Sequence, residues 1–238
     1  LPQSPTPLKD SPESPLIEVE DLGLRVENRW LVRKLNFAIG AGEFFALVGN
    51  SGSGKSTLLK TLAGIRKPEE GSVRVNVPTT LPIGMIFQDL QLADGASALK
   101  NALSGSLGRH SFLSTLFGFP KDELEEANKL MHTLGLSGKS KQWTSTLSRG
   151  ERQRLAIVRS LIAHPSILLA DEPVASLDQD WAEQTLQLIK DRQGHQNGCV
   201  VCSLHDLDQV EDHANQVLQL NEEEPEKWSL IAKERNTP

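Results

Sequence analysis

Several residue types and patterns are scarce or absent in this chain, and each absence narrows what the protein can be. The 238 residues include no tyrosine, two cysteines and two methionines, and aromatic residues make up only 5%. No apolar run approaches the ~20 residues that a membrane-spanning helix needs, so we expect a soluble chain. Acidic side chains exceed basic ones, and the formal net charge of −6 argues against a nonspecific nucleic-acid-binding surface. We therefore expect no nucleic-acid partner.

The two cysteines form a C-x-x-C pattern, which often indicates a metal site or a disulfide. Cys199 and Cys202 lie, however, in a segment that is typical of a β-strand. Residues three apart on a strand face opposite sides, so neither one metal ion nor a simple disulfide explains the pair. We predict buried, reduced thiols, which suit a cytosolic compartment.

The first fifteen residues are rich in proline, serine and charged side chains. Such a composition cannot build a core, so residues 1–15 are expected to form a disordered arm. They also lack the apolar stretch of a signal peptide. The chain opens with Leu1 rather than methionine, which leaves the true start of the protein open.

A glycine-rich segment satisfies every position of the phosphate-binding P-loop pattern. The apolar residues 44–48 before it predict a buried parallel strand. Residues 57–63 after it have apolar side chains at helical spacing, with Gly64 as a stop. A strand, a glycine loop and a helix in this order predict binding of a nucleoside triphosphate. The expected binding residues are Gly49, Asn50, Ser51, Gly52, Ser53, Gly54, Lys55, Ser56 and Thr57.

The residue types of this loop suit contact with phosphate. The three glycines permit a close backbone approach, so that successive N–H groups can ring the phosphates beside the positive end of a helix. Lys55 can reach the β- and γ-phosphates, and Ser56 offers a hydroxyl to Mg²⁺. The alternative is a flexible Gly/Ser turn with a solvated lysine, which the flanking strand and helix disfavour.

Two adjacent acids follow a second apolar strand, predicted at residues 166–170. Ligands of open α/β sheets collect at the carboxyl edge, where Asp171 and Glu172 lie. Asp171 would hold Mg²⁺, and Glu172 would take the proton from an attacking water as general base. Alternatively, the two acids cap the following turn, because Asp-Glu-Pro also starts helices.

Four further segments complete a pattern found in one enzyme family. Residues 147–154 precede the acidic strand, residues 175–178 follow it, and His205 and Gln88 each follow an apolar strand-like run. With the P-loop and the acidic strand, they resemble the signature motif, D-loop, switch histidine and Q-loop of an ATP-binding cassette (ABC) ATPase. The resemblance covers nearly the whole chain, with six motifs in the family's order.

This resemblance implies a head-to-tail dimer. Each ATP would lie between the P-loop of one cassette and the signature side of the other, which presents Ser148, Gly150 and Asp178. The residues themselves agree, because Ser148 and Gly150 immediately precede a predicted helix at residues 152–162. They thereby offer a hydroxyl and backbone N–H groups at a positive helix end.

The resemblance also implies roles for the two isolated polar residues. His205 would contact the γ-phosphate and help to hold Glu172 and the water in place. Gln88 would sense Mg²⁺ and water and couple the site to a membrane partner. A lone histidine after a strand is more often structural, so this role rests on the other motifs. The expected catalytic residues are Glu172, His205 and Gln88, and the expected Mg²⁺ ligands are Ser56, Gln88 and Asp171.

The chain departs from the family pattern in two places. Arg149 replaces the first glycine of the signature motif, so we expect that side to be altered but active. Val26 holds the place where many cassettes have an aromatic residue, usually tyrosine, that stacks on adenine. Stacking is worth about 1–3 kcal/mol. Either Trp30 or an arginine face substitutes, or the base is held loosely, and we predict modest ATP affinity and poor discrimination against GTP.

The predicted fold is α/β: a P-loop NTPase of ABC type, with a mostly parallel core sheet, an antiparallel β subdomain and a helical subdomain. Residues 16–238 are expected to form one domain, with residues 16–88 and 148–238 as the catalytic core and β subdomain. Residues 89–147 are expected to be helical. Within them, a helix is predicted with Asp122 as its cap, Gly135 near its stop and an apolar face that includes Leu124 and Met131.

The helical region holds the only indication of cargo. Residues 101–109 and 116–120 are similar to the ATPases of phosphonate importers. The apolar residues 112–119 are either the core of a helical hairpin or a docking site for a permease.

We therefore expect an importer ATPase for phosphonate or a related oxyanion. It would act with a second cassette, permease subunits and an extracytoplasmic binding protein, at the cytoplasmic face of the inner membrane. The alternatives are an exporter or lipid-extraction ATPase, or a soluble ABC ATPase.

Overall fold

A computed structural model describes residues 14–77, 83–109 and 118–232. Its larger sheet has six strands in the order β5-β6-β7-β3-β8-β9. All neighbours are parallel except β8 and β9. The strands are β3 (Phe44–Val48), β5 (Ile83–Ile86), β6 (Ile167–Asp171), β7 (Cys199–Ser203), β8 (Gln216–Gln219) and β9 (Ser229–Ala232).

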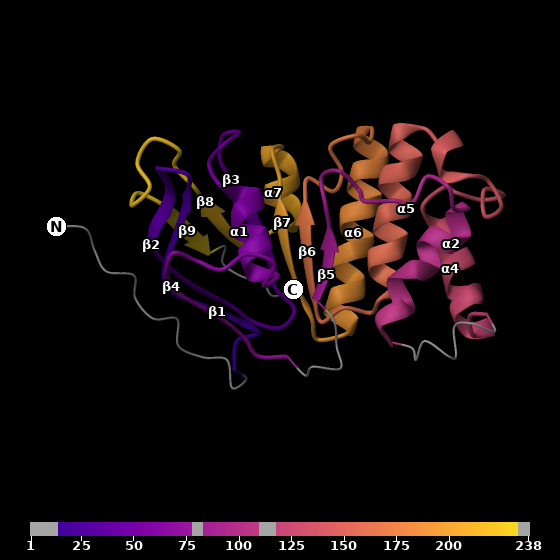
Figure 1. The fold of residues 1–238 in the computed structure, drawn as a ribbon, viewed down its shortest axis with the longest axis horizontal. Helices are drawn as coiled ribbons and strands as arrows, with labels where there is room; N and C mark the ends of the chain where they lie inside the picture. Colours follow the sequence, from indigo (N-terminus) through magenta and orange to yellow (C-terminus); the bar gives the residue numbers. More distant parts are fainter. Residues whose placement is uncertain (1–13, 78–82, 110–117, 233–238) are drawn as a thin grey trace.

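A second, antiparallel sheet has three strands in the order β2-β1-β4. They are β1 (Ile17–Val26), β2 (Arg29–Ile39) and β4 (Glu70–Val75). This sheet lies on one side of the molecule with helix α1 (Lys55–Leu62) between it and the parallel sheet (Figure 1). The predicted combination of a parallel core and an antiparallel sheet is confirmed.

The parallel sheet is buried on both faces, which explains its almost uninterrupted apolar strands. Successive side chains of each central strand point to opposite faces of the sheet, and each face has its own hydrophobic core. In β7, Cys199 packs with α1 and the antiparallel sheet, whereas Cys202 packs on the opposite face. The prediction that the two thiols are buried and face opposite sides of a strand is therefore confirmed.

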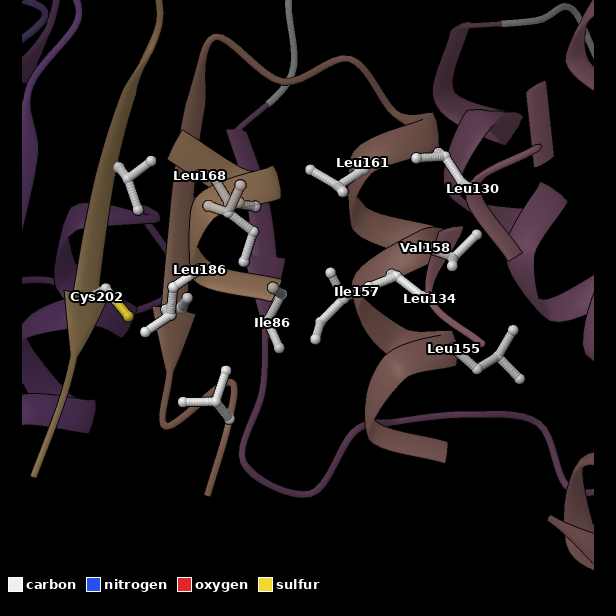
Figure 2. Packing of buried hydrophobic residues seen from close by; sticks show 14 of the residues in the cluster. Ile86, Leu130, Leu134, Leu155, Ile157, Val158, Leu161, Leu168, Leu186 and Cys202 are labelled. Atoms are coloured by element: carbon white, nitrogen blue, oxygen red, sulfur yellow. The ribbon is translucent and has the colours of Figure 1, made fainter. Parts of the chain in front are cut away.

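Helices lie on the other side of the parallel sheet. They are α2 (Ala98–Leu103), α4 (Lys121–Thr133), α5 (Arg149–Ile162), α6 (Gln179–His195) and α7 (Leu207–His213), with 3₁₀ turns at Ser104–Arg109 and Thr144–Thr146. α5 and α6 contact the strands, whereas α2 and α4 pack against α5. Figure 2 shows Ile157 of α5 on the side of the sheet and Val158 on the side of α4. Full burial of such an aliphatic side chain contributes about 1.5–3 kcal/mol.

The start of helix α4 differs from the sequence prediction, which gave Asp122 as the cap. It begins at Lys121, with Pro120 at the N-cap position, so Asp122 lies inside the first turn and does not cap. Its carboxylate still lies at the positive end of the helix dipole, which is why an acid there resembles a cap in the sequence. Gly135 follows the C-cap residue, as expected for a stop.

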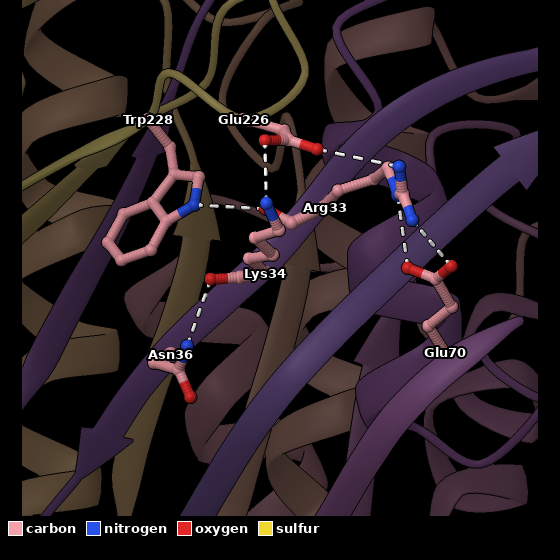
Figure 3. A network of polar contacts seen from close by, with 6 residues as sticks. All are labelled: Arg33, Lys34, Asn36, Glu70, Glu226 and Trp228. Carbon is pink, nitrogen blue, oxygen red and sulfur yellow. Dashed lines mark hydrogen bonds and ion pairs between the residues drawn. The ribbon is translucent and has the colours of Figure 1, made fainter.

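A polar network fastens the C-terminal segment to the antiparallel sheet (Figure 3). The guanidinium of Arg33 donates to both carboxylate oxygens of Glu70, at 3.0 and 2.7 Å, and to Glu226 at 3.4 Å. The Trp228 indole donates to the Arg33 carbonyl at 3.2 Å. The bond to Glu70 raises the pKa of Arg33. These contacts hold the loop after β8 beside the glycine-rich segment.

No helix in the described ranges is both long and apolar enough to cross a membrane.

Candidate active site

The glycine-rich segment forms the turn between β3 and α1, at the carboxyl edge of the parallel sheet. Gly52 and Gly54 have φ values of 86° and 103°, a region that side chains disfavour. A Cβ at Gly54 would lie 3.0 Å from Cβ of Leu31, and one at Gly52 would lie 3.0 Å from a carboxylate oxygen of Glu222. The loop therefore wraps closely, and α1 begins directly at Lys55.

Lys55 points back into this loop. Its ammonium donates to the carbonyls of Gly49 and Asn50, at 2.7 and 3.1 Å, and the residue is only 6% exposed. Burial lowers the pKa of Lys55, while the nearby carboxylates of Glu172 and Asp171 act in the opposite direction. The lysine is thus held next to the two acids, although over a hundred residues separate them in sequence.

One cavity of about 280 Å³ gathers six of the nine predicted P-loop residues, because the P-loop, the start of α1 and the ends of β5 and β6 meet there. Its lining residues are Val26, Arg29, Leu31, Ser51, Gly52, Gly54, Lys55, Ser56, Thr57, Gln88 and Glu172. Gly49 and Asn50 line an adjoining cavity of about 480 Å³ beside the C-terminal segment. Ser53 is fully buried.

The acidic pair meets the predicted histidine at the end of the neighbouring strand. Asp171 is 4% exposed, at the last position of β6, and Glu172 follows it with a φ of 49°. His205 Nε2 lies 2.6 Å from Oε1 of Glu172. The alternative was that these acids cap the following turn. Their carboxylates contact Ser203 and His205 instead, and the next helix begins at Gln179 with Asp178 as its N-cap.

Ser203 is a residue that the sequence reasoning missed. Its hydroxyl accepts the Glu172 N–H at 2.8 Å and donates to Oδ1 of Asp171 at 2.9 Å. Ser203 pairs with Asp171 in the parallel register of β6 and β7. A polar residue at the end of the otherwise apolar run 199–202 was the available signal.

Gln153 of α5 was also missed. Its side-chain amide donates to the Pro173 carbonyl at 2.6 Å and lies 3.5 Å from the Glu172 carbonyl. The turn that carries Glu172 is therefore held by hydrogen bonds from two elements, α5 through Gln153 and β7 through Ser203.

The signature residues lie at the start of α5, with one difference from the prediction. The helix begins at Arg149, so Gly150 lies within its first turn rather than before it. The Ser148 hydroxyl accepts the Glu151 N–H, and the Glu151 carboxylate accepts the Ser148 N–H, which together form a capping box. This reciprocal cap starts the helix earlier than the apolar pattern suggested. Arg149 is exposed.

Ser148, Gly150 and Asp178 do not line the P-loop cavity. They lie near one another instead: a Cβ on Gly150 would lie 3.3 Å from the Ser176 carbonyl, in the turn before Asp178. Asp178 itself accepts the Trp181 N–H at 3.0 Å as the N-cap of α6. The predicted binding residues thus form two groups on one chain.

Trp30 and Arg29, two candidates to replace the missing aromatic residue, lie differently relative to the cavity. Trp30 packs against the guanidinium groups of Arg25 and Arg33, whose Cζ atoms are 5.5 and 4.5 Å from its ring centroid, and it does not line the cavity. This placement disfavours Trp30 as the substitute and leaves an arginine face or a loosely held base. Arg29, which does line the cavity, donates to the Gly52 carbonyl at 3.0 Å and pairs with Glu222 at 2.9 Å.

These residues fit a nucleotide and Mg²⁺. The loop glycines, whose added Cβ atoms would meet other groups, leave the backbone open to the close approach of a phosphate. In the described part of the chain, no three His, Cys, Asp or Glu side chains converge to hold a metal. Mg²⁺ ordinarily needs only one or two protein carboxylates, since phosphates and water supply its other ligands. From this chain, Ser56 would supply a hydroxyl ligand to Mg²⁺, Gln88 an amide oxygen and Asp171 the carboxylate.

Comparison with known proteins agrees with this geometry. The family model described as "ABC transporter" matches residues 32–175, more than half of the chain. This chain belongs to the ABC transporter family. It has the ABC ATPase fold and is an ATP-binding ATPase of that family.

Two curated relatives and one solved structure illustrate the match. The phosphonates import ATP-binding protein of Trichormus variabilis is 39% identical over 203 residues, which are 82% of this chain and 83% of that protein. An aliphatic sulfonates import ATP-binding protein of Rhizobium johnstonii is 32% identical, over 92% of this chain and 82% of its own. A dimeric, post-hydrolysis ATP-binding cassette bound to ADP and phosphate superimposes with a TM-score of 0.77 at 25% identity, over 90% of this chain and 97% of its own.

The strongest sequence clue to a docking surface, residues 112–119, lies almost entirely outside the described residues. Only its end is described, where Phe119 packs against the core on the helical side of the sheet.

Proposed function

We propose that this chain is the ATP-hydrolysing subunit of an importer for phosphonate or a related oxyanion. The cargo class is supported by the names of relatives that match about four-fifths or more of the chain, one for phosphonates and one for aliphatic sulfonates. Phosphonate and sulfonate share a tetrahedral anionic head group, so either belongs to the proposed class.

The separation of the predicted binding residues into two groups supports action as a pair of cassettes. One group surrounds the P-loop cavity, and the other, Ser148, Gly150 and Asp178, lies away from it. A head-to-tail pair would bring the second group of one copy to the nucleotide of the other. ATP would then close the pair, and hydrolysis would let it reopen.

Within each site, we assign the chemistry to neighbouring side chains. Lys55 and the loop N–H groups bind the phosphates. Mg²⁺, when bound, neutralises charge on the phosphates. Glu172 accepts the proton of the attacking water, and His205 holds the carboxylate of Glu172 and contacts the terminal phosphate. General-base assistance typically contributes about 10²–10⁴ in rate.

The proposed assembly places the pair at the cytoplasmic face of the inner membrane, bound to two permease subunits. Gln88 lies at the edge of the cavity, after β5, and would pass the closing motion to the permease. An extracytoplasmic binding protein would deliver the oxyanion. Residues 89–147 would form the helical subdomain that carries this contact, and no nucleic acid takes part.

The experiment that tests the function uses Glu172→Gln, which should bind ATP, stop turnover and accumulate the closed pair. The variant is used with Mg-ATP to capture partners from membranes of the source organism, which are identified by mass spectrometry. Glu125→Gln, an exposed glutamate on α4, is the matched control. The recovered binding protein is then titrated with alkylphosphonates, alkylsulfonates and sulfate.

Recovery of a permease with a binding protein that takes one of these oxyanions supports the proposal. Recovery of an export or lipid-extraction protein would replace the importer with that function. Recovery of only soluble ribosome- or DNA-associated proteins would overturn transport altogether. Normal ATP turnover by Glu172→Gln would show that the assigned base is wrong.

A further inference from the structure

The buried hydroxyl of Ser203 joins the two acidic residues of the site. It accepts the backbone N–H of Glu172 at 2.8 Å and donates to Oδ1 of Asp171 at 2.9 Å. Ser203 has no exposed surface, and Asp171 has only 4%. One side chain therefore contacts both acids from the neighbouring strand.

The hydrogen-bonding capacities of the two partners allow only one direction for the Ser203 O–H bond. A backbone N–H can only donate, a carboxylate only accepts, and a serine hydroxyl has a single hydrogen to give. The hydrogen must point to Asp171 and a lone pair to Glu172. Because the Ser203 hydroxyl itself is fully buried, water does not readily replace either bond when the hydroxyl is removed.

Glu172 needs this support because its backbone is in an uncommon conformation. Its φ of 49° lies in the left-handed region, which residues with a Cβ rarely adopt. The Ser203 bond holds its N–H, and Gln153 holds the following carbonyl, of Pro173, at 2.6 Å. In that conformation the Glu172 carboxylate meets His205 at 2.6 Å.

We propose that Ser203 is a positioning residue for ATP hydrolysis, whose hydroxyl fixes the Asp171 carboxylate and the Glu172 backbone in one arrangement. The inference rests on the roles proposed above for those two acids. Ser203 has no exposed surface, so it would act only through these two acids. The competing explanation is that Ser203 is merely a satisfied buried group that stabilises β7.

The test compares Ser203→Ala and Ser203→Thr with Ser160→Ala. Ser160 is also a buried serine, but its hydroxyl binds only the backbone carbonyls of Ala156 and Met85. Groups that orient catalytic ligands typically contribute 10–100-fold to activity or metal affinity. Ser203→Ala should therefore lower kcat about 10–100-fold and raise the Mg²⁺ concentration for half-maximal rate, while the ATP Kd changes less than about 3-fold.

Threonine keeps the hydroxyl and suits a strand, so Ser203→Thr should recover most of the rate. Ser160→Ala should keep the wild-type kcat. All rates are expressed per folded protein at a temperature where near-UV circular dichroism shows a native fold, so lost stability cannot imitate lost catalysis. A kcat that is equal in Ser203→Ala and wild type, or equally low in the threonine and alanine variants, would overturn the inference.

A double-mutant cycle separates positioning from structure. If Ser203 acts through the acids, adding Ser203→Ala to Glu172→Gln should lower the residual single-turnover rate by less than about 3-fold, because residues of one unit are not additive. An equal loss in both backgrounds would favour the structural explanation. Normal ATP turnover by Glu172→Gln would instead contradict the assignment of Glu172 as the general base, a result distinct from any outcome for Ser203.

Discussion

His205 Nε2 lies 2.6 Å from Oε1 of Glu172, although 33 residues separate the two in sequence. The contact forms because β6 and β7 are parallel neighbours, so the residues after their carboxyl ends meet at one edge of the sheet. The Glu172 side chain is 23% exposed and the His205 side chain 50% exposed. Glu172 lines the cavity, and His205 contacts its carboxylate from the more exposed side.

His205→Ala should lower kcat by about 10–100-fold, because the Glu172 carboxylate loses the group that orients it. The ATP Kd should change less than about 3-fold, since Lys55 and the P-loop stay intact. Phosphate release at saturating Mg-ATP and a binding titration measure the two quantities. His195→Ala, at an exposed histidine in the last turn of α6, is the control and should behave as wild type. A wild-type kcat for His205→Ala would contradict the assigned role.

Lys55→Ala should abolish nucleotide binding. The ammonium is the cation closest to the loop carbonyls, and its removal leaves the phosphates facing Asp171 and Glu172 without compensation. The measurement is thermal unfolding with and without Mg-ATP, because a ligand that binds the native state at 100 times its Kd stabilises it by about 2.7 kcal/mol.

In that assay the wild type and Lys60→Ala should show the shift, since Lys60 is an exposed lysine on the same helix. Lys55→Ala should show none. A full shift in Lys55→Ala would mean that the nucleotide lies elsewhere.

Arg29→Ala should weaken ATP and GTP binding by similar factors, because the bond from Arg29 to the Gly52 carbonyl supports the P-loop, which either nucleotide would contact through its phosphates. We expect ATP and GTP affinities within about 3-fold of each other in the wild type and in the variant. Trp30→Ala is the control, since Trp30 lies outside the cavity, and it should leave both affinities unchanged. Competition titrations measure the six dissociation constants, for ATP and GTP with each of the three proteins. Strong adenine selectivity that Trp30→Ala removes would show that the base stacks on Trp30 after all.

The two thiols should be unreactive in the native protein. Burial raises the pKa of Cys199 to about 12, and it raises the pKa of Cys202 as well. At pH 8 the thiolate fraction of Cys199 is on the order of 10⁻⁴, whereas an unfolded cysteine with a pKa near 8.5 is roughly one-quarter ionised. Ellman's reagent should therefore titrate both thiols quickly in 6 M guanidinium chloride and neither within an hour in buffer.

Because the folded pKa values are the higher ones, thiol ionisation also predicts a loss of stability with rising pH. Stability is retained below the unfolded pKa near 8.5 and falls as the pH rises from there towards 12. Chemical denaturation at pH 8 and pH 10 measures the difference. Rapid labelling of one thiol in the native protein would show local opening of β7.

The sequence determined the parts of the site that depend on local chain chemistry. A strand, three glycines, a lysine and a helix start within a few residues of one another, so the P-loop can be predicted without distant contacts. The strand Phe44–Val48 appears with its predicted bounds, and the acidic strand differs by one residue at each end. α5 begins three residues before its predicted start at residue 152, because the capping box of Ser148 and Glu151 extends the helix beyond its apolar pattern.

Only the tertiary structure decided which distant residues meet. No spacing in the sequence reveals that Ser203 binds Asp171, because that contact follows from the order of strands in the sheet. Nor does alternation along β2 show whether Arg29 or Trp30 lines the cavity, since that depends on which side of the strand packs over the P-loop. Local propensity fixes the loop, whereas sheet order and strand orientation fix its neighbours.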